Sequence, residues 1–186
     1  LISNGFQVNY LSVDKSGIIN TMDLKNIISK KTSLVSIMFG NNEVGTIQPI
    51  SEIVKICHEN KVVFHTDAVQ AVGKVAIDVK ELGVDLLSIS SHKLHGPKGV
   101  GALYIKDGVK IDPVILGGGQ EFRLRSGTEN VASIVGFGQA CEIAQNNLIE
   151  NSSLIKKLQT LLVKRVLDEI PEVTFNGHSE YRLSNN

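Results

Sequence analysis

Short apolar segments alternate with segments of helical spacing along most of this chain. The clearest apolar segments, at residues 34–39, 62–66 and 86–89, are bounded by polar or glycine-containing stretches and contain many β-branched side chains. The stretches between them repeat apolar residues three and four positions apart. Regular alternation of strands and helices is typical of a parallel sheet covered by helices. The chain is therefore predicted to have an α/β fold with a mainly parallel sheet.

Other elements are expected before and after this alternation. Residues 5–11 alternate as a strand does, and residues 101–105 form a further apolar strand. Helices are predicted at the segments that begin at Thr21, Pro49, Val79, Val131 and Ser152. Residues 173–175 are interpreted as the start of a smaller C-terminal domain.

The charge balance argues against a nucleic-acid or membrane partner. Lysine plus arginine and aspartate plus glutamate number 19 each, so no basic field is available to attract nucleic acid. The apolar runs are too short and too often interrupted by charge to cross a bilayer. Cys57 and Cys141 do not form a disulfide framework, which favours the reducing cytoplasm. A small-molecule ligand fits this composition best.

Polar side chains follow each predicted parallel strand. Asn42 follows the first, Asp67 and Gln70 follow the second, and Ser90 to Lys93 follow the third. Because ligands bind outside the carboxyl ends of parallel strands, these groups are expected to share one site. Burial beside a sheet core makes an amine lose its proton more easily, and a neutral amine attacks a carbonyl to form a Schiff base. Lys93 is therefore the candidate reactive group.

This set of groups suits pyridoxal 5′-phosphate. In enzymes that use this cofactor, a lysine binds the aldehyde, and an acidic residue keeps the pyridine nitrogen protonated so that the ring can withdraw electrons. Lys93 and Asp67 supply these two groups. The other polar side chains are then available for the ring hydroxyl and the phosphate.

Motifs spread over nearly the whole chain resemble those of cysteine desulfurases in the class V aminotransferase family. They occur in the family's order and at matching intervals, and they span residues 38–49, 66–74, 90–101, 117–121 and 125–130. The resemblance implies a fold type I pyridoxal-phosphate domain. It makes Lys93 the Schiff-base lysine and Asp67 the partner of the pyridinium nitrogen.

The resemblance also assigns the remaining cofactor-binding residues and implies a homodimer with shared sites. The matching positions are Asn42 and Gln70 at the ring hydroxyl, Ser90 and His92 at the phosphate, and Thr128 at the phosphate of the partner subunit's cofactor. The implied reaction removes sulfur from L-cysteine to give alanine and an enzyme persulfide. The sulfur would pass to an iron–sulfur scaffold or to tRNA thiolation. A selenocysteine lyase, or another enzyme of the family, is the alternative.

Four features of the family have no counterpart here: the histidine that stacks on the cofactor, a Gly-Thr phosphate loop, the sulfur-accepting cysteine and a substrate-binding arginine. The chain also begins without methionine. It is therefore interpreted as an interior piece, inactive in isolation. Residues 1–140 are expected to belong to the large cofactor-binding domain, and residues 141–186 to a linking helix and the start of the small domain. Cys57 and Cys141 lie in predicted helices and are expected to be structural.

Simpler readings of the same residues remain open. Asp67 is equally suited to cap a helix after its strand. A metal hydrolase using His65, Asp67, His92 and His95 is a rival enzyme class, although His92 and His95 flank a turn and no further acidic ligand accompanies them. No metal is therefore expected. A third possibility is a structural piece that has kept the fold without the chemistry.

Overall fold

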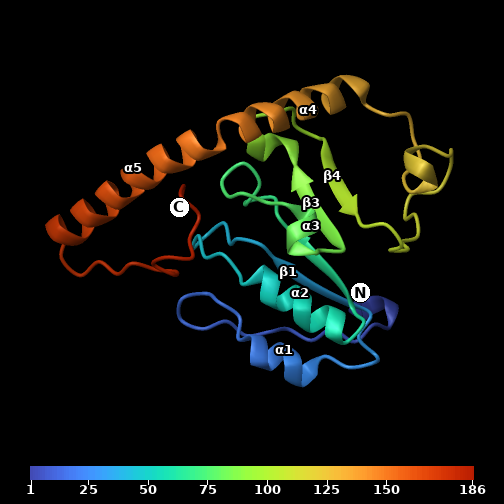
Figure 1. The fold of residues 1–186 in the computed structure, drawn as a ribbon, viewed down its shortest axis with the longest axis horizontal. Helices are drawn as coiled ribbons and strands as arrows, with labels where there is room; N and C mark the ends of the chain where they lie inside the picture. Colours follow the sequence, from blue (N-terminus) through green and yellow to red (C-terminus); the bar gives the residue numbers. More distant parts are fainter.

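A four-stranded sheet in the order β1-β2-β3-β4 forms the centre of the computed structural model, which describes all residues from 1 to 186 (Figure 1). The strands β1 (Leu34–Met38), β2 (Val63–Asp67) and β3 (Leu86–Ser90) are parallel neighbours. The last strand, β4 (Gly101–Ile105), pairs antiparallel with β3. The predicted α/β fold with a mainly parallel sheet is confirmed.

Helices lie close to their predicted positions. They are α1 (Thr21–Ile27), α2 (Ile50–Glu59), α3 (Val79–Leu82), α4 (Val131–Asn146) and α5 (Leu148–Glu169), with short 3-10 turns η1 (Ile2–Asn4), η2 (Ser91–Leu94) and η3 (Glu121–Arg123). The side chains of Asn20 and Asp78 cap the N-termini of α1 and α3 by accepting hydrogen bonds from main-chain N–H groups. Asn147 separates α4 from α5, slightly earlier than the sequence predicts. None of these helices is both long and apolar enough to cross a bilayer.

The main core lies between α2 and one face of the sheet. Ile53 and Cys57 of α2 and Phe64 of β2 are completely buried, and Val35 and Leu87 extend the same face onto β1 and β3. The α2 residues recur at helical spacing, whereas the strand residues are alternate ones. The helical spacing in α2 and the alternation in the strands therefore place these side chains in one apolar layer.

The opposite face of the sheet is only partly covered. Leu34 and Met38 of β1 are 47% and 39% exposed, and Leu103 of β4 is 44% exposed. The sequence predicts a buried strand over 34–39, and for this face the prediction is wrong. β1 is the edge strand of the sheet, and only its alternate side chains point towards α2.

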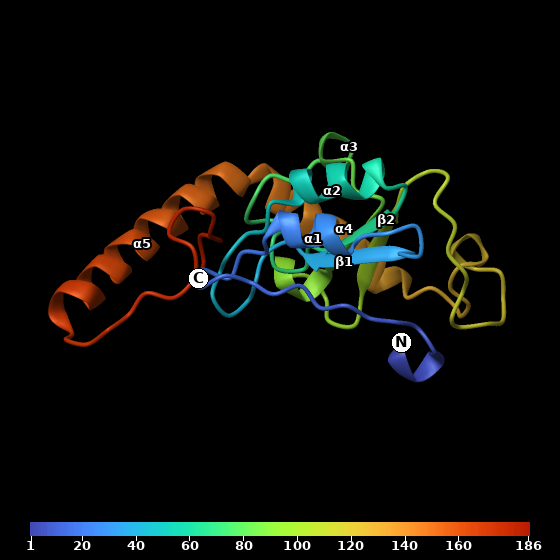
Figure 2. The same ribbon diagram turned by 90° about the horizontal axis from the view of Figure 1, so that it is seen from below.

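A further strand prediction is wrong. Residues 5–11 form no strand, and Phe6 and Tyr10 are 57% and 84% exposed. Figure 2 shows this N-terminal segment passing beneath β1 without joining the sheet, with the N-terminus farther away from it. Residues 173–175, interpreted as the start of a smaller domain, lie in neither a helix nor a strand. An alternating or apolar pattern is not sufficient, because a strand also needs a neighbour that satisfies its N–H and C=O groups.

The segment after α5 folds back towards the loop that follows β1 (Figures 1 and 2). Leu183 is buried in the main core, and its N–H donates to the carbonyl of Gly45. In the same way the Ile47 N–H donates to the carbonyl of Tyr181. Residues near the C-terminal end of the chain therefore support the loop that carries Asn42.

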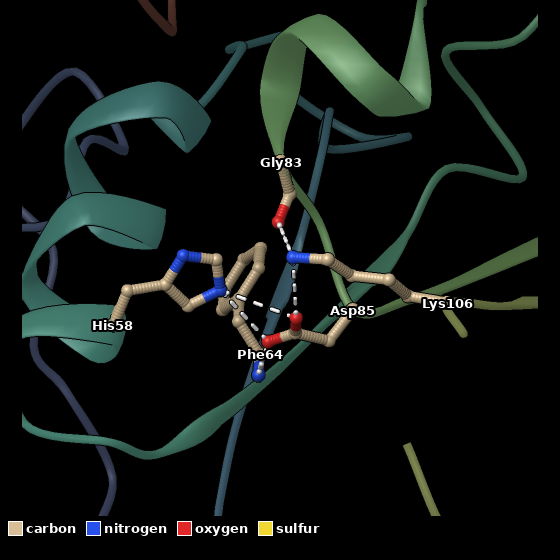
Figure 3. Close-up of polar contacts among 5 residues, drawn as sticks. All are labelled: His58, Phe64, Gly83, Asp85 and Lys106. Carbon is tan, nitrogen blue, oxygen red and sulfur yellow. Dashed lines mark hydrogen bonds and ion pairs between the residues drawn. The ribbon is translucent and has the colours of Figure 1, made fainter. Parts of the chain in front are cut away.

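A polar cluster around Asp85 joins α2, β2 and the end of β4 to the start of β3 (Figure 3). The Asp85 carboxylate accepts a hydrogen bond of 2.9 Å from the Phe64 N–H, and it lies 3.0 Å from His58 Nε2 and 3.2 Å from Lys106 Nζ. Burial raises the pKa of Asp85, but the bonds from Phe64, His58 and Lys106 outweigh burial and lower it. The carboxylate is therefore stabilised in its charged form.

Replacing Asp85 with alanine should lower the free energy of unfolding by about 2–3 kcal/mol, because the buried Phe64 N–H loses its charged acceptor and the partly exposed His58 and Lys106 lose their partner. The pKa of Asp85 is lower in the folded state than in the unfolded state. Its contribution is therefore full above the unfolded-state pKa and is lost as the pH falls through the folded-state pKa. Urea unfolding should reveal a difference between parent and variant that shrinks from about pH 7 to about pH 3.

The exposed residue Asp107 provides the control for this prediction, because its side chain has no bonded partner. Asp107→Asn should leave stability unchanged within about 0.5 kcal/mol over the same pH range. An Asp85→Ala variant that loses the same stability at every pH would contradict the electrostatic explanation.

Candidate functional site

The polar residues that the sequence predicts to share one site lie at the carboxyl ends of three parallel strands. Asp67 is the last residue of β2 and lies in register with Met38, the last residue of β1. Ser90 is the last residue of β3, and Lys93 follows in η2. Parallel pairing brings these strand ends to one edge of the sheet. The structure therefore brings these groups to the same edge.

The turn η2 presents a hydroxyl, an imidazole and an amine in succession. Ser90 Oγ lies 2.7 Å from His92 Nδ1, within hydrogen-bond distance. Ser91 and Leu94 are buried, and Leu94 packs against α4. These two anchors fix η2 to the core and leave His92 and Lys93 exposed.

Lys93 is exposed, so its predicted burial beside the sheet core is wrong. The chain turns into η2 directly after the strand, and the inward positions of that turn belong to Ser91 and Leu94. The predicted desolvation falls on a different lysine. Burial, followed by the positive charge of Lys93, lowers the pKa of Lys74. Two lysines therefore lie close enough to interact at this edge.

The Asp67 carboxylate is exposed at the end of β2. Its Oδ1 accepts a hydrogen bond of 2.9 Å from the Val69 N–H, which caps a turn; no helix begins directly after β2, so the helix cap considered as the simpler alternative is not formed. Its Oδ2 has no hydrogen-bond partner in the protein. The observed cap and a second role as acceptor for a cationic ligand are therefore compatible.

A histidine bridges the three parallel strands behind Asp67. His65 Nδ1 lies 2.8 Å from Ser36 Oγ on β1, and His65 Nε2 lies 2.9 Å from Ser88 Oγ on β3. Burial lowers the pKa of His65, although the negative charge of Asp67 opposes that shift. Both ring nitrogens are thus engaged with serine hydroxyls.

Gln70 and Asn42 have different surroundings. Gln70 is partly buried, and its Oε1 accepts a hydrogen bond of 3.1 Å from Lys74 Nζ. Asn42 is exposed, and its Nδ2 donates to Glu43 Oε1 at 2.8 Å. The Gln70 side chain is therefore hydrogen-bonded to Lys74, whereas the Asn42 side chain is hydrogen-bonded to the neighbouring residue in its own loop.

Thr128 lies apart from the other candidate residues. It is exposed, and it belongs to the segment between β4 and α4 that loops outward from the sheet (Figures 1 and 2). No hydrogen bond or ion pair joins it to the residues at the strand ends. This chain by itself does not bring Thr128 into the same cluster.

The groups at the strand ends fit pyridoxal 5′-phosphate. Asp67 offers a carboxylate for the ring nitrogen, Ser90 and His92 offer donors for phosphate oxygens, and Lys93 offers a primary amine for the aldehyde. The histidine, cysteine and acidic side chains form no group of three or more that could hold a metal ion. The residues named for the metal-hydrolase alternative are therefore not brought together as metal ligands.

Residues 2–185 match the family model described as Aminotransferase class-V. The chain belongs to the class V aminotransferase family. It is 54% identical over 186 residues to cysteine desulfurase IscS of Methanosarcina thermophila, a match that covers 100% of this chain and 46% of that protein. The chain spans about half the length of the curated relatives that it matches.

Solved structures of related proteins have the same fold. A NifS-like protein matches with a TM-score of 0.93 and 43% identity, over 98% of this chain and 50% of its own. SspA in complex with cysteine matches with a TM-score of 0.73 and 45% identity, over 76% of this chain and 41% of its own. The fold type I assignment within the class V family is thereby confirmed.

Neither cysteine of this class V chain carries an activated thiol. Cys57 is buried in α2, where burial and then the charge of Asp85 raise its pKa to about 11. Burial also raises the pKa of Cys141 in α4. Since the thiolate is the reactive form, both residues are poor nucleophiles near neutral pH.

Proposed function

We propose that this chain is part of a pyridoxal-phosphate-dependent cysteine desulfurase, which converts L-cysteine to alanine and transfers the sulfur to an enzyme cysteine. The observation that carries the proposal is the convergence of Asp67, Ser90, His92 and Lys93 at the carboxyl edge of one parallel sheet. The 54% identity to an IscS desulfurase along the whole chain favours this activity, as does the related SspA structure described with cysteine. A selenocysteine lyase is less favoured by these relatives.

Each residue has a role that follows from its chemistry. The Lys93 amine would attach the cofactor aldehyde, release it to the substrate amine and then be free to move protons. The Asp67 carboxylate would hold the proton on the ring nitrogen, and Ser90 with His92 would donate to the phosphate. The bound cofactor would supply an electron sink for the substrate amino acid.

We further propose that the protein is a homodimer in which Thr128 binds the phosphate at the partner subunit's site. Thr128 lies outside the local cluster but on a projecting segment. The same segment exposes Val114, Leu116 and Phe122 at 93%, 78% and 95%. Large apolar side chains exposed together are typical of a protein interface. Asn42 would bind the ring hydroxyl together with Gln70.

The proposed sulfur acceptors are an iron–sulfur scaffold or the tRNA thiolation pathway, and the proposed location is the cytoplasm. The two free thiols support a reducing compartment. The assignment of residues 1–140 to the large domain and of residues 141–186 to the linking helix and the start of the small domain remains part of the same proposal.

The direct test is to incubate the full-length protein with pyridoxal phosphate and L-cysteine and to measure alanine and sulfide. We expect equal amounts of alanine and released sulfur in the presence of a thiol reductant. L-Selenocysteine in place of L-cysteine tests the alternative. Turnover of selenocysteine without turnover of cysteine would favour the lyase, and absence of alanine from both would refute the proposal.

The cysteines of this chain should be dispensable for turnover. Because burial raises the pKa of Cys57 and Cys141, neither should accept sulfur from the substrate. A full-length Cys57→Ala/Cys141→Ala variant should therefore keep its turnover within about twofold of the parent. Loss of turnover in a variant that still folds and binds the cofactor would identify one of these thiols as a participant.

A further inference from the structure

Lys74 connects the Gln70 side chain to the surroundings of Lys93. Its Nζ donates to Gln70 Oε1 over 3.1 Å, and both side chains are partly buried. Its main-chain carbonyl accepts a hydrogen bond of 2.8 Å from Ser152 Oγ at the start of α5. Lys74 is therefore fixed by both its backbone and its side chain.

Gly73 allows this turn to lie directly against η2. Its φ of 76° is in the left-handed region, and an added Cβ would collide with the Cδ2 atom of Leu94. Leu94 is the neighbour of Lys93 in η2. The close contact between Gly73 and Leu94 explains why the charge of Lys93 reaches Lys74 and contributes to lowering its pKa.

The bond to Lys74 determines which end of the Gln70 amide is free. An ammonium group has three donors and no acceptor, so only the amide oxygen of Gln70 can face it. The oxygen is therefore committed to Lys74, and Gln70 Nε2 has no hydrogen-bond partner in the protein. The free end of the side chain is a donor, which suits a phenolic oxygen and would not suit a donor group.

We propose that Lys74 is a positioning residue that locks the Gln70 amide so that its Nε2 donates to the ring hydroxyl oxygen of pyridoxal phosphate. This inference rests on the proposed function, since it assumes that the cofactor occupies the strand ends. Without Lys74 the amide would be free to rotate and to present its oxygen, an acceptor, to an oxygen that also carries negative charge. Lys74 acts through Gln70 and is not itself assigned to the reaction.

The test uses full-length apoprotein titrated with pyridoxal phosphate, with binding followed through the visible absorption of the bound cofactor. Lys74→Met should weaken binding by about three- to tenfold, the size of one net hydrogen bond. Lys74→Arg should recover most of that loss, because it retains a donor to Gln70. Lys80→Met, which removes an exposed lysine of α3, should leave binding unchanged and controls for the loss of charge.

A double-mutant cycle separates positioning from a general effect on folding or charge. In a Gln70→Ala background, Lys74→Met should cause no further loss of affinity, because the amide that it orients is absent. Equal losses in both backgrounds, or a Lys74→Met variant that binds like Lys80→Met, would overturn the inference while leaving the proposed function intact. Failure of the parent protein to bind pyridoxal phosphate would instead refute the proposed function, and this inference with it.

Discussion

Replacing Lys93 with alanine in the full-length protein is expected to prevent covalent attachment of the cofactor and to reduce cysteine turnover by at least about 10³-fold, within the range for loss of a positioned acid–base group. Lys93 is exposed in η2 directly after β3, so the substitution leaves no cavity in the core. Steady-state production of alanine and the visible spectrum of the purified protein provide the two measurements.

The matched control is Lys98→Ala, which removes another exposed lysine a few residues further along the chain. This variant should keep the spectrum and the rate of the parent. If Lys93→Ala kept turnover within about tenfold of the parent, a nearby amine would have to replace it, and Lys74 would be the first candidate because burial lowers its pKa.

Asp67→Asn should lower the rate of the chemical step by about 10- to 100-fold, which corresponds to the loss of one hydrogen bond between charged groups. Asparagine retains an oxygen that can accept from the Val69 N–H, so the local cap should survive. It has no negative charge to keep the ring nitrogen protonated. Single-turnover kinetics and urea unfolding of the same variant distinguish the two roles.

The two roles of Asp67 give opposite outcomes. A large fall in rate with stability within about 1 kcal/mol of the parent supports the role at the cofactor. An unchanged rate with a clear loss of stability would mean that Asp67 serves only to cap the turn after β2.

The parallel strands were predictable because each combines an apolar run with a boundary that the sequence marks. β1, β2 and β3 lie within one or two residues of their predicted positions, and the polar residues at their ends follow from parallel pairing. Residues 5–11 have a comparable alternating pattern but no neighbouring strand. Local pattern identifies a strand only when pairing is available, and pairing is a property of the whole fold.

The surroundings of individual side chains were less predictable. Whether Lys93 or Lys74 is buried depends on how η2 turns after β3 and on the contact between Gly73 and Leu94. The one sequence signal for Lys74 is its spacing of four residues from Gln70, next to a glycine. Thr128 could be matched to the family's motif, but its proposed role at a partner subunit's site lies outside what one chain displays.

Borohydride reduction of the full-length protein loaded with pyridoxal phosphate, followed by peptide mapping, tests the central claim most directly. Reduction fixes the cofactor permanently to the amine that holds it. We expect the modified residue to be Lys93, in the peptide that covers η2. Modification of Lys74 or Lys98 instead, or a protein in which no lysine is modified, would contradict the assignment of the strand ends as the cofactor site.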